Sequence, residues 1–288
     1  MTFNRNHSRS TPDTRWYETL VRSIHSPQIS PLGEPLPAFP PEELQRNTTG
    51  LSSEAAVRQA FEFYRNVVDA LERAGKPLEA SSRVLDFGFG WGRVSRVFMD
   101  KVSIRNIHGV DVDEDFASLT RELFDSTNFR ACKPFPPTQH ADGSFDVICA
   151  YSVFSHLSGA ACHAWMQEFV RLLTPGGVVV FTTRHVSFMD FCEWAGRQPD
   201  APAYWRALGT LFSDFEEARA RYRRGELVHA SSAGVSGGGP RDSTFYGETW
   251  IPEQYVRTEF GPDLEFVAGY FDREKYDQAC FALRRRAV

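Results

Sequence analysis

The sequence predicts an α/β protein built on a doubly wound, seven-stranded sheet with helices on both faces and the last strand antiparallel. Three observations support this fold class. Short apolar runs alternate with helical patterns from residue 84 to residue 181, a glycine-rich turn follows the first run, and the last two apolar segments stand close together. The chain has 288 residues, of which 42% are hydrophobic, so it is long enough to bury a full core.

The first part of the chain is predicted to be an N-terminal extension over residues 1–50, ahead of a main domain over 51–288. Residues 1 to about 15 are polar and are predicted to be disordered, and a short helix is predicted at 16–24. Six prolines then keep residues 27–43 extended. We expect this segment to lie as an arm across the main domain, where it could help to close a site.

The main domain begins with an amphipathic helix. Its apolar residues recur every three or four positions from 52 to 74, and Gly75-Lys76-Pro77 ends the pattern. The same two periodicities predict the alternating elements that follow. These are a strand at 84–87, a helix from 94, a strand at 107–112, a helix at 115–124, strands at 128–132 and 145–150, a helix at 161–173 and a strand at 178–181.

The alternation breaks after the fifth strand, and residues 185–249 are predicted to be an insertion or lid. The connection from residue 272 to 277 is too short for a crossover helix, so the final strand must turn back antiparallel. The elements predicted in this part of the chain are helices at 188–197 and 203–223, a glycine-rich loop at 231–247, a helix at 252–260 and strands at 264–271 and 278–283.

Composition narrows the class of protein. A net charge of −5 and a pI near 5.9 argue against electrostatic binding of nucleic acid. The five cysteines are scattered and form no Cys-x-x-Cys pair, so we interpret them as reduced core thiols. No apolar run approaches the roughly 18 residues that span a bilayer, and no signal peptide is visible. We therefore expect a soluble, cytoplasmic protein that binds neither nucleic acid nor membrane, and the spacing of its His, Cys and acidic residues predicts no metal.

The turn after the first strand reads Asp86-Phe87-Gly88-Phe89-Gly90-Trp91-Gly92-Arg93. Its three glycines let the backbone turn sharply and approach a ligand without an intervening Cβ. A dinucleotide fingerprint would require its third glycine at position 93, which is Arg93. The spacing instead resembles the first motif of class I S-adenosylmethionine-dependent methyltransferases. The resemblance implies the strand order 3-2-1-4-5-7-6 for the sheet and S-adenosylmethionine as the cofactor.

The resemblance also implies roles for individual residues around the cofactor. Asp86 would help to hold the methionine ammonium, or alternatively only cap the turn. Arg93 could pair with the methionine carboxylate, or be solvated in the first turn of a helix. Tyr151 opens the loop after the fourth strand, which faces the reactive end of the cofactor pocket. The loop that would wrap the methionine comprises Phe87, Gly88, Gly90 and Gly92.

The adenosine end of the cofactor is assigned to the second strand. Asp111 lies 111 − 88 = 23 residues beyond Gly88, and its carboxylate could accept both ribose hydroxyls, or merely cap the next helix. Val112 could pack on adenine. Many family members carry an acid after the third strand to read the adenine amine, but this chain has Cys132-Lys133-Pro134-Phe135 there. Backbone groups or Asp142 could substitute, although Asp142 is better interpreted as a turn residue.

The catalytic candidates are His156, Tyr246 and Glu248. His156 follows the fourth strand and could remove a proton from an acceptor hydroxyl, whereas the alternative is a structural histidine. Tyr246 and Glu248 follow the glycine-rich loop and could position or deprotonate an acceptor, or pack at a hinge. Alignment of an acceptor behind an activated methyl group can supply roughly 7–11 kcal/mol, so no fixed catalytic signature is required.

We therefore expect methyl transfer to a small-molecule or glycan acceptor, with oxygen as the predicted methylated atom. One alternative is a catalytically inactive protein that binds the cofactor and serves as a partner or regulatory subunit. Another is a nicotinamide-dependent oxidoreductase, which Arg93 and the reversed last strand disfavour.

Overall fold

The computed structural model describes residues 14–232, 234–235, 237–272 and 278–287. The predicted disorder of residues 1–13 and the connection at 273–277 lie outside these ranges. The centre of the molecule is a sheet with five adjacent parallel strands. In spatial order they are β3 (Phe129–Ala131), β2 (Ile107–Asp111), β1 (Val84–Phe87), β4 (Phe145–Ala150) and β5 (Leu173–Arg184).

The last two strands complete this sheet, and the final one runs in the opposite direction to both of its neighbours. β9 (Gln278–Arg285) runs antiparallel to β5, with Val178 opposite Arg284 and Arg184 opposite Gln278. β8 (Leu264–Tyr270) pairs antiparallel with β9 and forms the outer edge. β9 and β8 therefore occupy the seventh and sixth positions of the predicted strand order, and the predicted fold class is confirmed.

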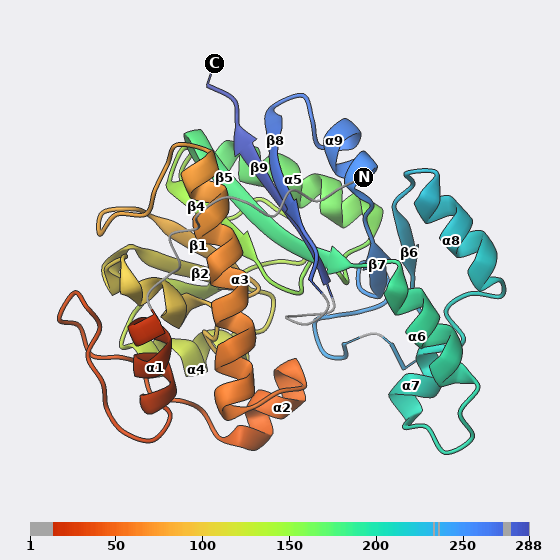
Figure 1. Ribbon diagram of the computed structural model, residues 1–288, viewed down its shortest axis with the longest axis horizontal. Helices are drawn as coiled ribbons and strands as arrows, with labels where there is room; N and C mark the ends of the chain where they lie inside the picture. The colour runs from red at the N-terminus through yellow and green to blue at the C-terminus, as the bar shows by residue number, and fades with distance from the viewer. Residues whose placement is uncertain (1–13, 233, 236, 273–277, 288) are drawn as a thin grey trace.

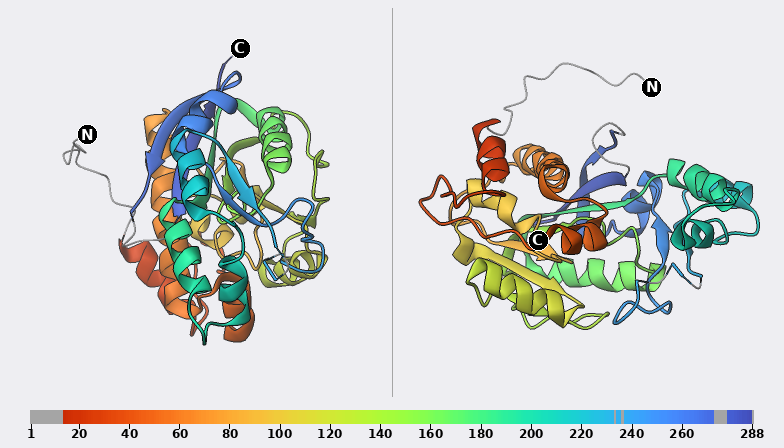
Figure 2. Two further views of the ribbon diagram at one scale, coloured as in Figure 1. Left: turned by 90° about the vertical axis from the view of Figure 1, so that its right-hand side faces the viewer. Right: turned by 90° about the horizontal axis from the view of Figure 1, so that it is seen from below.

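Helices cover both faces of the sheet, and its apolar strands are therefore buried on both sides (Figures 1 and 2). On one face, α3 (Ser53–Arg73) and α1 (Thr14–Arg22) pack over side chains such as Val84 and Val178. On the other face, α5 (Gly159–Leu172) packs over the alternate positions, including Leu85 and Val179. The helices predicted at 16–24, 52–74 and 161–173 are therefore present, as are α4 (Glu114–Phe124) and α9 (Glu253–Glu259).

The prediction of an α-helix directly after the glycine turn is wrong, because a 3-10 helix forms there. The chain forms a six-residue 3-10 helix, η1 (Ser95–Asp100), in which the Val97 N–H bonds to the Val94 carbonyl. A second 3-10 turn, η2 (Ile104–Asn106), leads into β2. A 3-10 helix spans more length per residue than an α-helix, so it suits a short connection between two strands.

The proline-rich segment lies along η1 and is held there by a buried cation. The Arg96 guanidinium donates hydrogen bonds to the carbonyls of Pro37 and Ala38, at 3.2 and 3.3 Å, and lies 3.9 Å from the centre of the Phe39 ring. The segment ends in α2 (Glu42–Thr49), a helix that the proline pattern did not predict. This helix matters because it brings the polar residues around Thr48 to the site described below.

The insertion after β5 forms a small lobe beside the carboxyl end of that strand (Figure 1). The single helix predicted at 203–223 is wrong, because two separate helices form there. Gly209 lies against Gly196, so that a Cβ on Gly209 would come within 2.2 Å of the Gly196 Cα, and Asp214 caps the next helix. The helices of the lobe are α6 (Ser187–Gly196), α7 (Ala203–Leu208) and α8 (Phe215–Arg223).

Two short strands that the sequence did not predict return the chain from the insertion to the sheet. β6 (Val228–Ala230) pairs antiparallel with β7 (Glu248–Trp250), and Trp250 pairs with Arg184 at the end of β5. β9 pairs along one edge of β5 as far as Arg184. On the opposite edge, β4 pairs with β5 only as far as Phe181, so β7 pairs with the remaining residues of that edge. The insertion therefore ends beside the carboxyl ends of β4 and β5. Among the described residues, no helix is both long and apolar enough to cross a bilayer.

Candidate active site

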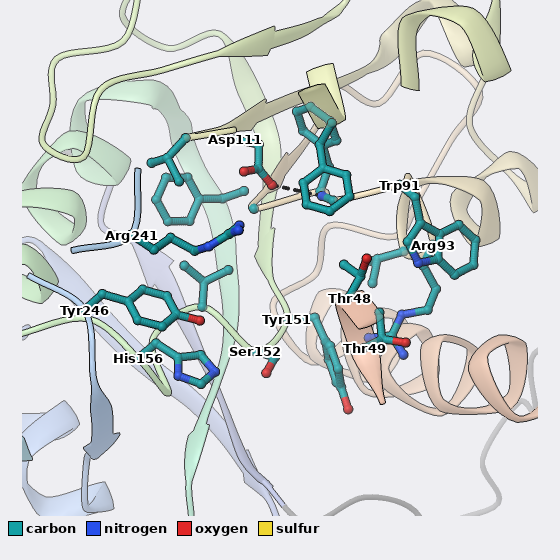
Figure 3. Close-up of a pocket in the computed structure, with 18 of the residues that line it drawn as sticks. Thr48, Thr49, Trp91, Arg93, Asp111, Tyr151, Ser152, His156, Arg241 and Tyr246 are labelled. Atoms are coloured by element: carbon teal, nitrogen blue, oxygen red, sulfur yellow. Dashed lines mark hydrogen bonds between the residues drawn. The ribbon is translucent and has the colours of Figure 1, made fainter. Parts of the chain in front are cut away.

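A cavity of about 840 Å³ opens at the carboxyl ends of the parallel strands. Ligands of doubly wound folds bind at this edge, because loops from several strands converge there. The walls come from the glycine turn, the ends of β2 and β4, α2 and the insertion, as Figure 3 shows. Of the twelve predicted site residues, nine line the cavity and three, Asp86, Gly92 and Glu248, do not.

The glycine turn needs its glycines for two different reasons. Gly88, Gly90 and Gly92 have φ angles of +75°, +53° and +75°, a region that favours glycine. Gly88 and Gly90 line the cavity, where the backbone can approach a ligand. A Cβ on Gly92 would lie 2.4 Å from the Phe124 ring, so this glycine permits close packing of the turn against α4.

Asp111 at the end of β2 shapes this turn directly. Its Oδ2 atom accepts a hydrogen bond of 3.0 Å from the Gly90 N–H, shown as the dashed line in Figure 3, and Oδ1 accepts one of 3.0 Å from the Asp113 N–H. Burial raises the pKa of Asp111, while these backbone donors and the nearby Arg241 guanidinium oppose the rise. The carboxylate also lines the cavity, so it is available to a ligand there.

Asp86 lies behind the turn rather than in the cavity wall. Its side chain is 1% exposed and accepts a 2.6 Å hydrogen bond from the Ser95 hydroxyl. Burial raises its pKa to about 7. The structure thus places this carboxyl beneath the glycine turn, at the start of η1.

Arg93 is a buried cation that faces the cavity. It is 7% exposed, and its Nη1 donates a 2.5 Å hydrogen bond to the Gln59 amide oxygen. Its guanidinium lies 5.1 Å from the centre of the Tyr151 ring. Burial lowers the pKa of Arg93, and the Tyr151 and Asp86 groups oppose this shift. A cation in such surroundings favours an anionic ligand.

Ser152, which the sequence analysis did not single out, lies in the cavity wall in a left-handed conformation with φ of +60°. A closed ring of three hydrogen bonds joins it to Thr182 of β5 and Gln278 of β9. Its N–H donates to the Thr182 hydroxyl at 2.7 Å, that hydroxyl donates to the Gln278 oxygen at 2.7 Å, and the Gln278 amide donates to the Ser152 hydroxyl at 2.9 Å. Backbone strain of this kind is typical of functional sites.

His156 is fixed in one tautomer by its neighbours. Its Nδ1 atom lies 2.8 Å from the Gly247 carbonyl oxygen, which can only accept, so Nδ1 carries the proton and Nε2 keeps a lone pair. The imidazole stacks on the Tyr246 ring, with centroids 4.8 Å apart and 3° between the planes. Both side chains line the cavity, as Figure 3 shows. Burial lowers the pKa of His156, against the attraction of the Glu248 carboxylate.

Glu248 lies behind His156 and is fully buried. Its carboxylate accepts hydrogen bonds from Arg184 Nε at 2.7 Å and from the Tyr204 hydroxyl at 2.9 Å, and lies 3.5 Å from His156 Nδ1. Burial raises the pKa of Glu248, but the charges of Arg184 and His156 outweigh this effect and lower it overall. A carboxylate engaged in this way is held ionised and does not reach the cavity.

The cavity wall next to the ends of β2 and β3 is apolar. Val112, Phe116, Cys132 and Pro134 line it. Asp142 does not, because its carboxylate pairs with Arg171 Nη1 of α5 at 2.6 Å, which agrees with its interpretation as a turn residue. Phe89 and Trp91 also line the cavity, but their rings pack against Phe129 and Phe39. Within the described part of the chain, no three His, Cys, Asp or Glu side chains are grouped to hold a metal.

Comparison with known proteins agrees with this site. Residues 84–177, from β1 to the start of β5, match a family model described as a methyltransferase domain. This match identifies residues 84–177 as a methyltransferase domain. The matched range contains the glycine turn, Asp111 and His156, and the cofactor that the family implies is S-adenosylmethionine.

Solved structures of other enzymes resemble the methyltransferase more distantly. A methyltransferase of Clostridium acetobutylicum is 13% identical, with a TM-score of 0.48 over 80% of this chain and 91% of the other. A putative methyltransferase of Listeria monocytogenes is 13% identical, with a TM-score of 0.47 over 76% of this chain and 99% of the other. The search of curated proteins found no match.

Proposed function

We propose that this methyltransferase transfers a methyl group to a hydroxyl oxygen of a small-molecule or glycan acceptor, with His156 as general base. The observation that carries the proposal is the hydrogen bond between His156 Nδ1 and the Gly247 carbonyl. It leaves Nε2 as the proton acceptor on a side chain that lines the cavity. Because burial lowers the pKa of His156, the neutral base is the form present at neutral pH.

The cofactor would be held by the residues that the turn and β2 bring together. Arg93 supplies a buried positive charge for the methionine carboxylate, and Asp111 supplies acceptors for the ribose hydroxyls. Val112 and Phe116 offer apolar surface to adenine. Asp86, beneath the turn, acts on the bound ammonium through the electrostatic field and on the loop through Ser95.

Glu248 and Tyr246 are proposed as positioning residues for His156. Tyr246 fixes the plane of the imidazole by stacking. Glu248 stabilises the positive charge that appears on the ring when it takes a proton, while Arg184 keeps the carboxylate ionised. This division of roles follows the general arrangement of a base oriented by a third group.

The reaction itself needs alignment above all. The sulfonium of the bound cofactor supplies an activated methyl group. His156 Nε2 takes the hydroxyl proton as the acceptor oxygen forms its new bond to carbon, so the departing thioether leaves neutral and the imidazole becomes charged. Ser152, held rigidly by Thr182 and Gln278, faces the same space and can orient the acceptor.

The size and polarity of the cavity favour a small, hydroxylated acceptor. A volume of about 840 Å³ lies in the upper part of the range of roughly 300–1,000 Å³ that ligand sites occupy, enough for the cofactor and a small second molecule. Polar side chains from three elements and from the loop after β4 line the cavity together with His156. They are Ser152, Arg184, Tyr204 and Gln278.

The test is an acceptor screen with the full-length protein, S-adenosylmethionine and a panel of phenols, sugars and oligosaccharides, read by mass spectrometry. We expect at least one hydroxylated acceptor to gain a methyl group, and His156→Gln to slow transfer by about 10²-fold or more while leaving S-adenosylhomocysteine affinity unchanged. Methylation of amines alone would contradict the assignment of oxygen. Tight cofactor binding with no transfer to any acceptor would favour the inactive, cofactor-binding alternative.

A further inference from the structure

Arg241, in the glycine-rich loop of the insertion, reaches across the cavity to the cofactor end. Its Nη2 lies 3.3 Å from Asp113 Oδ2, and the two side chains are 27% and 18% exposed. Figure 3 shows the guanidinium between Asp111 and Tyr246, pointing into the cavity. Arg241 also lines a neighbouring hollow of about 630 Å³ that lies between α2 and the start of α4. The cation therefore forms part of the wall between the two spaces.

The local backbone is shaped to deliver this side chain. The Arg241 N–H bonds to the Gly238 carbonyl at 3.1 Å, which closes a tight turn whose Gly238 and Gly239 have φ angles of +70° and +57°. A Cβ on Gly237 would come within 2.8 Å of the Arg241 Cδ and Nε atoms, so only glycine leaves room for the arginine to pass. The same loop continues to Tyr246, which stacks on His156.

The partner of Arg241 stands on the rigid side of the site. Asp113 caps α4 by accepting a 3.1 Å hydrogen bond from the Asp115 N–H, and its own N–H donates to Asp111 Oδ1. Asp113 is thus fixed to the residue assigned to the ribose. The ion pair joins the insertion to the cofactor-binding wall of the main domain, across the opening between them.

We infer that Arg241 retains the cofactor: its ion pair with Asp113 closes the adenosine end of the cavity, and exchange of S-adenosylhomocysteine for S-adenosylmethionine requires that pair to break. The partly buried position of both groups protects the pair from screening by salt. Because the loop also carries Tyr246, opening at Arg241 loosens the stack on His156, so cofactor exchange and acceptor binding are coupled. The inference rests on the cofactor site and does not depend on the acceptor.

The test measures the dissociation rate of S-adenosylhomocysteine by stopped-flow tryptophan fluorescence, since Trp91 and Trp165 line the cavity. The variants are Arg241→Gln, Asp113→Asn and the double variant. Asparagine keeps an oxygen that can cap α4 and removes only the charge. We expect each single variant to dissociate about tenfold faster, the factor that corresponds to roughly 1.4 kcal/mol, and the double variant to be no faster than either single one.

Arg197→Gln is the matched control, because it removes an exposed arginine of the same insertion that pairs with Glu193 on α6. Its dissociation rate should equal that of the wild type. Hydrogen exchange supplies a second readout: amides of residues 237–247 should exchange faster in Arg241→Gln with cofactor bound. Unchanged dissociation in both single variants, or effects that add in the double variant, would overturn the inference. Absence of cofactor binding to the wild type would instead refute the cofactor assignment on which it rests.

Discussion

Asp111 Oδ2 and the Gly90 amide are joined by a 3.0 Å hydrogen bond, so the acid of β2 holds the glycine turn of β1 in shape. Asp111→Ala should therefore remove both the ribose acceptor and the support of the turn. We expect it to weaken S-adenosylhomocysteine binding by at least about 10²-fold in calorimetric titration, because more than one charge-assisted hydrogen bond is lost. Asp111→Asn can keep one acceptor oxygen and should bind with intermediate affinity. Equal affinity in Asn and wild type would show that the charge is unimportant.

Asp86 should make the cofactor-free enzyme less stable as pH rises. Its pKa is raised by burial from 3.8 to about 7, so the folded state binds more protons than the unfolded state between these values. The free energy of unfolding should then fall from pH 4 to pH 7, by up to about 4 kcal/mol from this group. Asp86→Asn removes the titration, and urea denaturation should show a flatter pH dependence and a more stable protein at pH 8. A steeper pH dependence in the variant would contradict the assignment.

The pH dependence of turnover should report His156. Because burial lowers its pKa below the usual value of about 6.5 for histidine, the neutral base is lost only below that pH, and kcat should be constant around neutral pH. Glu248→Gln removes the carboxylate that favours the protonated ring, so the acid limb of the profile should move to lower pH. Rate measurements from pH 5 to 8 on both proteins check this. A limb that stays in place in the variant would exclude Glu248 from positioning His156.

Gly92 should be more sensitive to substitution than another glycine of the same backbone conformation. Gly92 and Gly75 have φ angles of +75° and +70°, but a Cβ on Gly75 meets nothing within 4 Å, whereas one on Gly92 lies 2.4 Å from the Phe124 ring. Gly75→Ala measures the backbone strain alone, about 1 kcal/mol. Gly92→Ala adds the clash, and we expect a further 1–3 kcal/mol of destabilisation in chemical denaturation. Similar losses in the two variants would show that Phe124 moves aside freely.

Most of the fold could be predicted because its signals are local. The strands at β1, β2, β4 and β9 were visible as apolar runs, and the reversed last strand followed from the short connection before it. The helix predictions failed where one local sequence pattern masked another. The prolines before residue 42 hid α2, and the helical pattern at 203–223 hid the break that Gly209 packs into. β6 and β7 are short strands that form only because the end of β5 offers a free edge.

For the site, the sequence by itself determined the fold class, the glycine turn and the cofactor, because a turn, a strand end and their spacing are properties of neighbouring residues. Tertiary structure alone decided which groups face the ligand. It put Asp86 and Glu248 behind the wall, fixed the tautomer of His156 through a carbonyl 91 residues away, and brought Arg241 to Asp113. The physical reason is that burial, hydrogen-bond partners and charge pairing depend on distances between segments that the chain brings together only on folding.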